Sequence, residues 1–136
     1  MLEINIPNEI FERMLEQAQA ESPIEACGIL AGRDSTVERM YSMTNTEARE
    51  DHYMMEPKEQ FAAVKDMRAA GLNMLAIYHS HPATAARPSA EDVRLAFTPN
   101  ITYVIISLEQ SNGPMVKAFS VKDGQTTEVS VRIEKE

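Results

Sequence analysis

Residues 73–82 read Asn-Met-Leu-Ala-Ile-Tyr-His-Ser-His-Pro, an apolar run that ends in two histidines and a proline. The run Asn73–Tyr78 is typical of a short buried strand. Side chains two residues apart on a strand lie on the same face, so His79 and His81 point the same way. Zinc accepts imidazole nitrogens at about 2.0–2.1 Å, and both rings can reach one ion. The competing interpretation is two polar residues that face solvent at a strand end.

A third candidate ligand follows on the next predicted helix. Pro88-Ser89 begins this helix, and Asp92 lies in its first turn, from which it can turn back over the histidines. Three nitrogen and oxygen ligands with a fourth position left for water are typical of a catalytic zinc site. Alternatively, Asp92 closes a capping box with Ser89. We expect the two roles of Asp92 to exclude each other.

An acidic residue interrupts a second apolar stretch. Residues 24–31, Ile-Glu-Ala-Cys-Gly-Ile-Leu-Ala, predict a buried strand with Glu25 in its middle. An unpaired buried carboxylate is costly, so a polar group should face it. A zinc-bound water would serve, because the metal lowers the pKa of that water to about 7 and a glutamate can take its proton. The alternatives are contact with solvent or pairing with Arg33 or Arg39.

The rest of the chain predicts a mixed α/β order with an antiparallel end. A strand over residues 2–7 precedes a helix that Asn8 caps and Ser22-Pro23 ends, and a second helix runs from Pro57 to Gly71. Further strands are expected at 37–46, 101–108, 115–121 and 127–133, with a loop at 47–56, a helix from 88 to about 98, and turns at 32–34, 111–114 and 123–124.

Length and charge narrow the class of protein. The 136 residues predict one domain, and 43% hydrophobic residues supply a core. A formal charge of −8, from 13 basic and 21 acidic residues, argues against nucleic acid and membrane surfaces as partners. No apolar run reaches the roughly 20 residues of a transmembrane helix, and the acidic N-terminal residues do not match a secretory signal. These features predict a cytoplasmic protein.

Together these residues resemble a known signature. Glu25 in Pro-Ile-Glu-Ala-Cys-Gly, then His79-Ser80-His81-Pro82, Ser89 and Asp92, match the JAMM (MPN-plus) metalloprotease family at every position of the motif. The resemblance implies an MPN/JAMM-like, cytidine-deaminase-like α/β fold, in which helices flank a mixed central sheet and zinc lies at a strand end. It extends over residues 1–136 as a single catalytic domain.

The resemblance also implies a role for each motif residue. His79, His81 and Asp92 become the ligands of one zinc ion per chain, Glu25 the general acid/base, and Ser89 the hydroxyl that stabilises the oxyanion. The implied reaction is hydrolysis of a peptide or isopeptide bond. Cys27 is expected to pack as a small hydrophobic residue, and His52 is expected to be solvated, with no role.

The substrate follows from the branch of the family. The Tyr-His-Ser-His-Pro and Arg-Pro-Ser stretches are similar to a short bacterial branch, which implies a ubiquitin-like sulfur-carrier protein, or its conjugate, as the partner. Cleavage at the carrier's C-terminal glycine would release an amino acid or peptide. The alternatives are a non-catalytic MPN-type scaffold or binding module, against which the complete ligand set argues, and a structural zinc with Cys27 as fourth ligand.

Overall fold

The computed structural model describes residues 2–96, 98, 100–109 and 115–135. Its elements follow in the order β1 (Glu3–Pro7), α1 (Asn8–Glu21), β2 (Cys27–Arg33), β3 (Thr36–Met43), α2 (Pro57–Ala69), β4 (Asn73–His81), α3 (Ala90–Arg94), β5 (Thr102–Ser107), β6 (Met115–Lys122) and β7 (Gln125–Glu134). No helix in these ranges is long and apolar enough to cross a membrane.

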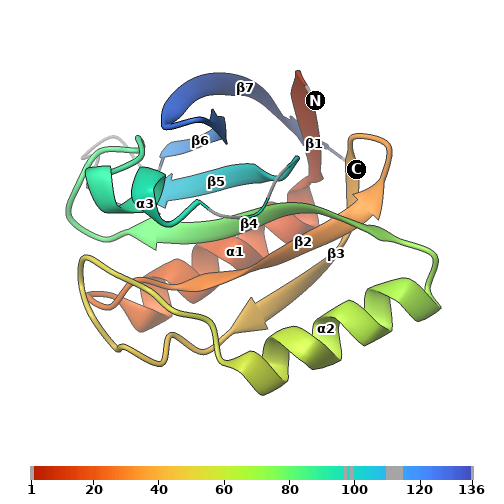
Figure 1. Ribbon diagram of the computed structural model, residues 1–136, viewed down its shortest axis with the longest axis horizontal. Coiled ribbons are helices and arrows are strands. Elements are labelled where there is room, and N and C mark those ends of the chain that lie inside the picture. Colours follow the sequence, from red (N-terminus) through yellow and green to blue (C-terminus); the bar gives the residue numbers. More distant parts are fainter. Residues whose placement is uncertain (1, 97, 99, 110–114, 136) are drawn as a thin grey trace.

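The strands form a closed barrel in the order β1-β3-β2-β4-β5-β6-β7 (Figure 1). β4 lies antiparallel to β2 and parallel to β5, so the predicted mixture of strand directions is confirmed. The predicted central sheet is closed into a barrel, because β7 pairs with β1 from Glu3↔Ser130 to Pro7↔Glu134. Strand twist accumulates across neighbouring strands and brings the last strand back to the first, a long-range effect that local sequence patterns do not reveal.

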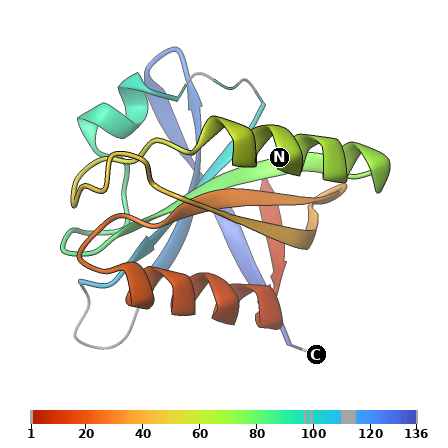
Figure 2. The same ribbon diagram turned by 90° about the horizontal axis from the view of Figure 1, so that it is seen from below.

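The two long helices lie on opposite sides of the part of the sheet formed by β2 and β4 (Figure 2). α1 buries Ile10, Met14 and Ala18 at a spacing of four residues, and these side chains join the hydrophobic cluster that contains Leu30 and Tyr78. α2 buries Ala63 and Met67 in a second cluster, with β2, β4 and β5. Both helices confirm the sequence prediction.

Several element ends differ from their predicted positions. Pro7 occupies the N-cap of α1, and the side chain of Asn8 instead donates to Glu12 at 3.1 Å. β2 begins at Cys27, two residues after Glu25, so this acid precedes the strand. α3 ends at Arg94, several residues before the expected stop.

The structure agrees with one of the predicted turns and differs from another. Asp123 and Gly124 have φ angles of 52° and 76°, as the predicted two-residue hairpin requires. The predicted turn at 32–34 is displaced, because β2 continues to Arg33. The predicted turn at 111–114 lies outside the described residues.

A close approach between two neighbouring strands fixes the centre of the sheet. Gly28 of β2 pairs with Tyr78 of β4, and a methyl group at Gly28 would lie 2.3 Å from the end of the Tyr78 ring. Tyr78 is 1% exposed, and its hydroxyl donates to Gln17 of α1 at 2.5 Å. The ring therefore cannot move aside without breaking a bond to α1.

We predict that Gly28→Ala lowers the free energy of unfolding by about 1–3 kcal/mol, because the added methyl overpacks the site. The cost should shrink when Tyr78→Leu is also present, since the opposing ring is gone. Urea unfolding of the single and double variants measures both effects. Ser42→Thr, which adds a methyl group at an exposed position on β3, is the matched control. Equal costs in the two backgrounds would contradict the packing argument.

Candidate metal centre

Three side chains converge at the end of β4. The Nε2 atoms of His79 and His81 lie 3.1 Å apart, and Asp92 Oδ2 lies 3.2 Å and 3.0 Å from them. Both histidines are buried and Asp92 is half-buried, and in the described part of the chain only these three residues form such a group. β4 supplies the two imidazoles and α3 supplies the carboxylate, as the spacing predicted.

The donor set fits a cation. Four ligands at about 2.0–2.1 Å around a tetrahedral zinc ion lie about 3.3 Å from one another, close to the separations here. His81 Nδ1 lies 2.8 Å from the carbonyl oxygen of Ala85, so Nδ1 carries the ring proton. In the neutral ring, Nε2 then turns a lone pair toward the lone pairs of Asp92. A positive ion between them removes this repulsion.

Burial and the close contacts shift the pKa of all three groups. Burial lowers the pKa of His79, which favours the neutral imidazole that a metal requires. Burial opposes the charge of Asp92, but the adjoining imidazoles of His79 and His81 and the Ser89 N–H outweigh it and leave the pKa of Asp92 well below its usual range. Burial likewise disfavours a charged His81, whereas Asp92 and the Ala85 carbonyl raise the pKa of His81.

Asp92 serves two roles with one oxygen. Ser89 is the N-cap of α3, and its hydroxyl accepts a hydrogen bond from Asp92 N at 3.0 Å. The Ser89 N–H in turn donates to Asp92 Oδ2 at 2.9 Å, which completes a capping box. The same Oδ2 faces both imidazoles, so the capping box does not turn this oxygen away from the histidines. A carboxylate oxygen has enough lone-pair sites for both contacts.

Glu25 is fixed beside this group by its main chain. Its N–H donates to the Arg49 carbonyl at 2.9 Å, and its own carbonyl accepts from the side chain of Asn45 at 3.0 Å. The next residue, Ala26, donates its N–H to the Ser80 hydroxyl at 2.8 Å and accepts from Ser80 N at 2.9 Å. Ser80, between the two histidines, thus ties the Glu25 segment to the end of β4.

One oxygen of the buried Glu25 carboxyl group lacks a hydrogen-bond partner among the described residues. Glu25 is 3% exposed, and the oxygen without a partner is Oε1. Burial raises the pKa of Glu25 to about 8, and the nearby charge of Asp92 adds to this while His81 opposes it. The alternatives of pairing with Arg33 or Arg39 are wrong, because Arg33 pairs with Glu38 and Arg39 with Asp66.

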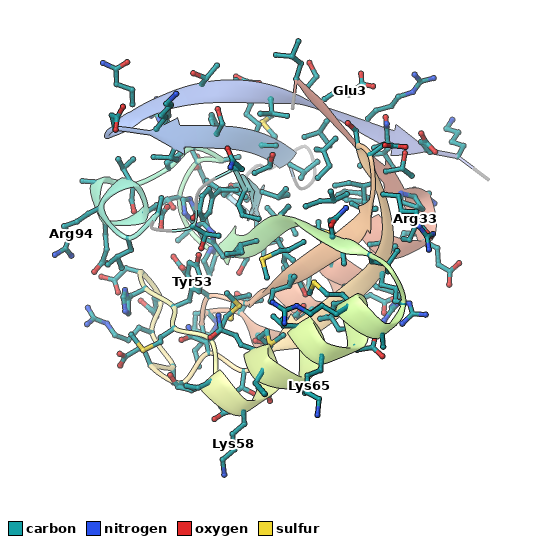
Figure 3. The ribbon with its side chains drawn as sticks, turned by 45° about the vertical axis from the view of Figure 1, so that its right-hand side comes forward. Glu3, Arg33, Tyr53, Lys58, Lys65 and Arg94 are labelled. Atoms are coloured by element: carbon teal, nitrogen blue, oxygen red, sulfur yellow. The ribbon has the colours of Figure 1, made fainter. Side chains whose placement is uncertain are left out.

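Sequence reasoning missed the contribution of the loop before α2. Tyr53 stacks on the His79 ring with centroids 4.7 Å apart and planes 23° apart. Figure 3 shows Tyr53 inside the outline of the molecule, whereas Lys58 and Lys65 point outward from α2. His52 is half-buried rather than solvated, and its Nδ1 lies 3.3 Å from Glu91 Oε1. The loop has no hydrophobic period, so no pattern could have revealed these contacts.

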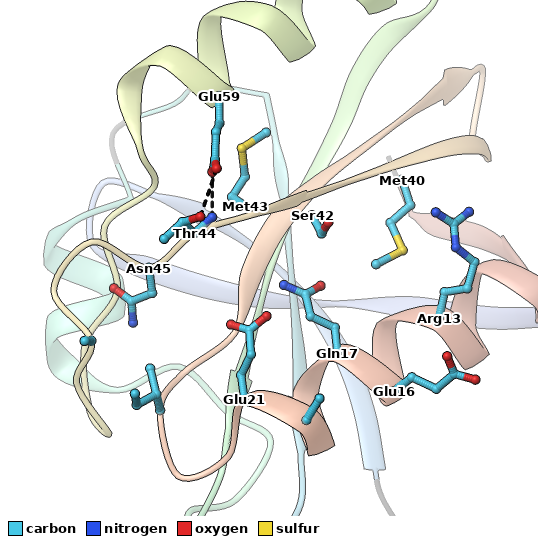
Figure 4. Close-up of a pocket in the computed structure, with 13 residues that line it drawn as sticks. Arg13, Glu16, Gln17, Glu21, Met40, Ser42, Met43, Thr44, Asn45 and Glu59 are labelled. Carbon is cyan, nitrogen blue, oxygen red and sulfur yellow. Dashed lines mark hydrogen bonds between the residues drawn. The ribbon is translucent and has the colours of Figure 1, made fainter.

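Two other features lie apart from the metal-binding group. Cys27 is buried in the cluster against α2, with Sγ 3.9 Å from the Met43 carbonyl, and burial raises the pKa of its thiol to about 12. It packs as a small hydrophobic residue, as expected. A cavity of about 830 Å³ lies between α1 and β3, where Gln17, Met40 and Glu59 are among its lining residues (Figure 4). None of the candidate site residues lines this cavity.

A mixed barrel with two histidines and an aspartate at the end of a central strand defines a domain of the JAB/MPN class. The family model described as prokaryotic homologs of the JAB domain (Prok-JAB) matches residues 7–122, and the chain belongs to this family.

Two named relatives and one solved structure are similar to this chain over most of its length. The chain is 35% identical over 127 residues to the CysO-cysteine peptidase of Mycobacterium tuberculosis, covering 92% of this chain and 87% of the relative. It is 33% identical over 125 residues to the probable TtuB-protein conjugate cleaving protease of Thermus thermophilus, covering 91% and 80%. The solution structure of a protein from Desulfitobacterium hafniense matches with a TM-score of 0.89 and 45% identity, covering 98% and 94%.

We predict that Ser80→Ala lowers the free energy of unfolding by about 1–3 kcal/mol, because the buried Ala26 N–H loses its acceptor. The substitution leaves both histidines in place, so metal content should not change. Urea unfolding and elemental analysis measure the two effects. Ser42→Ala, at an exposed position on β3, is the matched control. Unchanged stability in Ser80→Ala would show that the Glu25 segment is held by other contacts.

Proposed function

We propose that this chain is a zinc-dependent peptidase that hydrolyses a peptide or isopeptide bond at the C-terminal glycine of a ubiquitin-like sulfur-carrier protein. The observation that carries the proposal is the convergence of His79, His81 and Asp92 beside the buried carboxyl group of Glu25. We further infer that residues 1–136 act as one catalytic domain, since β1 and β7, from opposite ends of the chain, close the same barrel.

His79, His81 and Asp92 would hold the metal through Nε2, Nε2 and Oδ2. When bound, zinc supplies Lewis-acid polarisation of the scissile carbonyl and lowers the pKa of water. The three protein ligands leave room for a fourth, as in catalytic rather than structural sites. Cys27 does not complete the set, because its thiol lies in the core against Met43.

Glu25 is suited to move the proton. Its main chain is fixed by Asn45 and Arg49, and its Oε1 makes no competing hydrogen bond to the described residues. A carboxyl group whose pKa lies near neutrality can take a proton and give it up again within one turnover, and burial supplies that shift here. Glu25 would accept the proton of the attacking water and pass it to the leaving amine.

Ser89 is suited to stabilise the oxyanion. Its Oγ accepts a hydrogen bond from Asp92 N, which leaves the hydroxyl proton free to donate. Its side chain belongs to an exposed residue at the start of α3, so a substrate can approach it. A donor aimed at charge that develops only in the transition state accelerates the chemical step.

The substrate class is supported by the relatives. The mycobacterial relative is named for CysO-cysteine and the Thermus relative for TtuB-protein conjugates. Both matches cover more than nine-tenths of this chain. The high coverage favours the same kind of carrier substrate for this chain over a scaffold role.

We predict that purified protein supplied with zinc retains about one ion per chain and that Asp92→Asn loses it, because an amide oxygen carries no charge for the cation. An amide at position 92 can still accept from Ser89 N, so the cap of α3 persists. Elemental analysis measures the ion. Asp34→Asn, on an exposed turn, is the control. Wild-type protein without zinc would contradict the metal assignment.

We also predict that Glu25→Gln keeps its zinc but loses about 10²–10⁴-fold in turnover, because an amide cannot accept the proton of the attacking water. Release of the residue fused to the carrier's glycine, followed by mass spectrometry, measures turnover. Glu50→Gln, exposed in the same region, serves as the control and should retain full activity. Wild-type turnover in Glu25→Gln would rule out this mechanism.

A further inference from the structure

A pocket of about 230 Å³ opens beside the metal-binding group, and Asp92 is one of its lining residues. We call it the side pocket. Its apolar lining comes from the loop before α2, from β4 and β5, and from the end of α3: Tyr53, Met54, Met55, Ile77, Leu95 and Tyr103. The mechanism proposed above uses none of these side chains, so the pocket needs its own explanation.

The wall of the side pocket continues into the metal-binding group. Ile77 lies two residues before His79 on β4, so the two side chains share a face, and it pairs with Tyr103 of β5. Tyr53 stacks on the His79 ring and also lines the pocket. A group held in the side pocket therefore lies directly beside the reacting centre.

The pocket is held together by contacts on both sides. Met55 is buried and belongs to the isolated bridge with Asn45, whose side chain amide also fixes the carbonyl of His52 at 2.9 Å. His52 Nδ1 lies 3.3 Å from Glu91 Oε1, which connects the loop to α3. These contacts fix the loop against α3 and so hold the two walls of the pocket together.

The lining selects for an apolar occupant. Burying a charged side chain among Met55, Ile77 and Tyr103 would cost its hydration. Glu91 and Asp92, which also line the pocket, repel an acidic side chain in addition. The volume equals the liquid share of about eight water molecules, so it admits one side chain of moderate size.

We propose that the side pocket binds the apolar side chain of the residue released from the carrier, and so determines which conjugates are cleaved. This inference rests on the proposed function. A carrier tail that ends in glycines offers no side chain next to the scissile bond, so the nearest side chain to the metal-binding group belongs to the residue on the other side of that bond. Medium-sized residues such as Leu, Met or Cys match the apolar lining.

The test uses the zinc-supplied full chain and a ubiquitin-like carrier protein of the same organism, ending in Gly-Gly and fused to one further residue: Gly, Ala, Leu, Met or Asp. We expect kcat/KM to rise about 10-fold or more from Ala to Leu or Met. The Asp fusion should be cleaved more slowly than the Ala fusion.

Two variants test whether the preference for Leu over Ala arises in the side pocket. Leu95→Glu and Met54→Glu each put a carboxylate on a residue that lines the pocket. Leu95 is 36% exposed and Met54 is 51% exposed, so the charge can reach water and both variants should fold. We expect the Leu/Ala ratio of kcat/KM to fall to about 1 in each. Phe61→Glu is the matched control, because Phe61 is 58% exposed on α2 and does not line the pocket.

The outcomes separate this inference from the proposed function. If wild-type protein cleaves the Gly, Ala, Leu and Met fusions equally well, the side pocket has no such role. A Leu/Ala ratio that survives in both pocket variants, or that responds instead to the carrier residue before Gly-Gly, overturns the assignment as well. Absence of cleavage for every fusion overturns the proposed function itself.

Discussion

The two-residue period of β4 is the constraint on which the site depends. His79 and His81 face one side of the strand, and Ser80 between them faces the other. The histidines lie against Asp92. The Ser80 hydroxyl accepts a hydrogen bond from Ala26 N, and Ser80 N donates one to the Ala26 carbonyl. Hydrogen bonding to β2 and β5 holds the strand on both edges, so neither face can turn away. One tripeptide thus places two of the candidate metal ligands and anchors the Glu25 segment.

The capping box of α3 is the second element of this arrangement. Five residues are too few for a helix to persist alone in water, so α3 depends on its cap and its contacts. Asp92 closes the cap with the same oxygen that faces the histidines. The candidate metal ligand and the start of the helix therefore share one carboxylate oxygen.

Local sequence patterns predicted the features that neighbouring residues determine. They did not predict the features that depend on contacts between distant parts of the chain. The spacing of His79 and His81 and the cap signals around Ser89 were sufficient to bring three ligands together. Closure of the barrel by β1 and β7 joins residues more than a hundred positions apart, and no local pattern encodes it. Glu25 was expected within a strand because its neighbours are apolar, yet its segment is held by Asn45 and Arg49 from an irregular loop.

The same irregular loop links the metal-binding group to the side pocket. His79 Nδ1 has no hydrogen-bond partner among the described residues, so the usual carbonyl or carboxylate that orients a ligating imidazole is replaced here by the stacked ring of Tyr53. Because Tyr53 also lines the side pocket, this one aromatic ring connects the pocket to a candidate metal ligand.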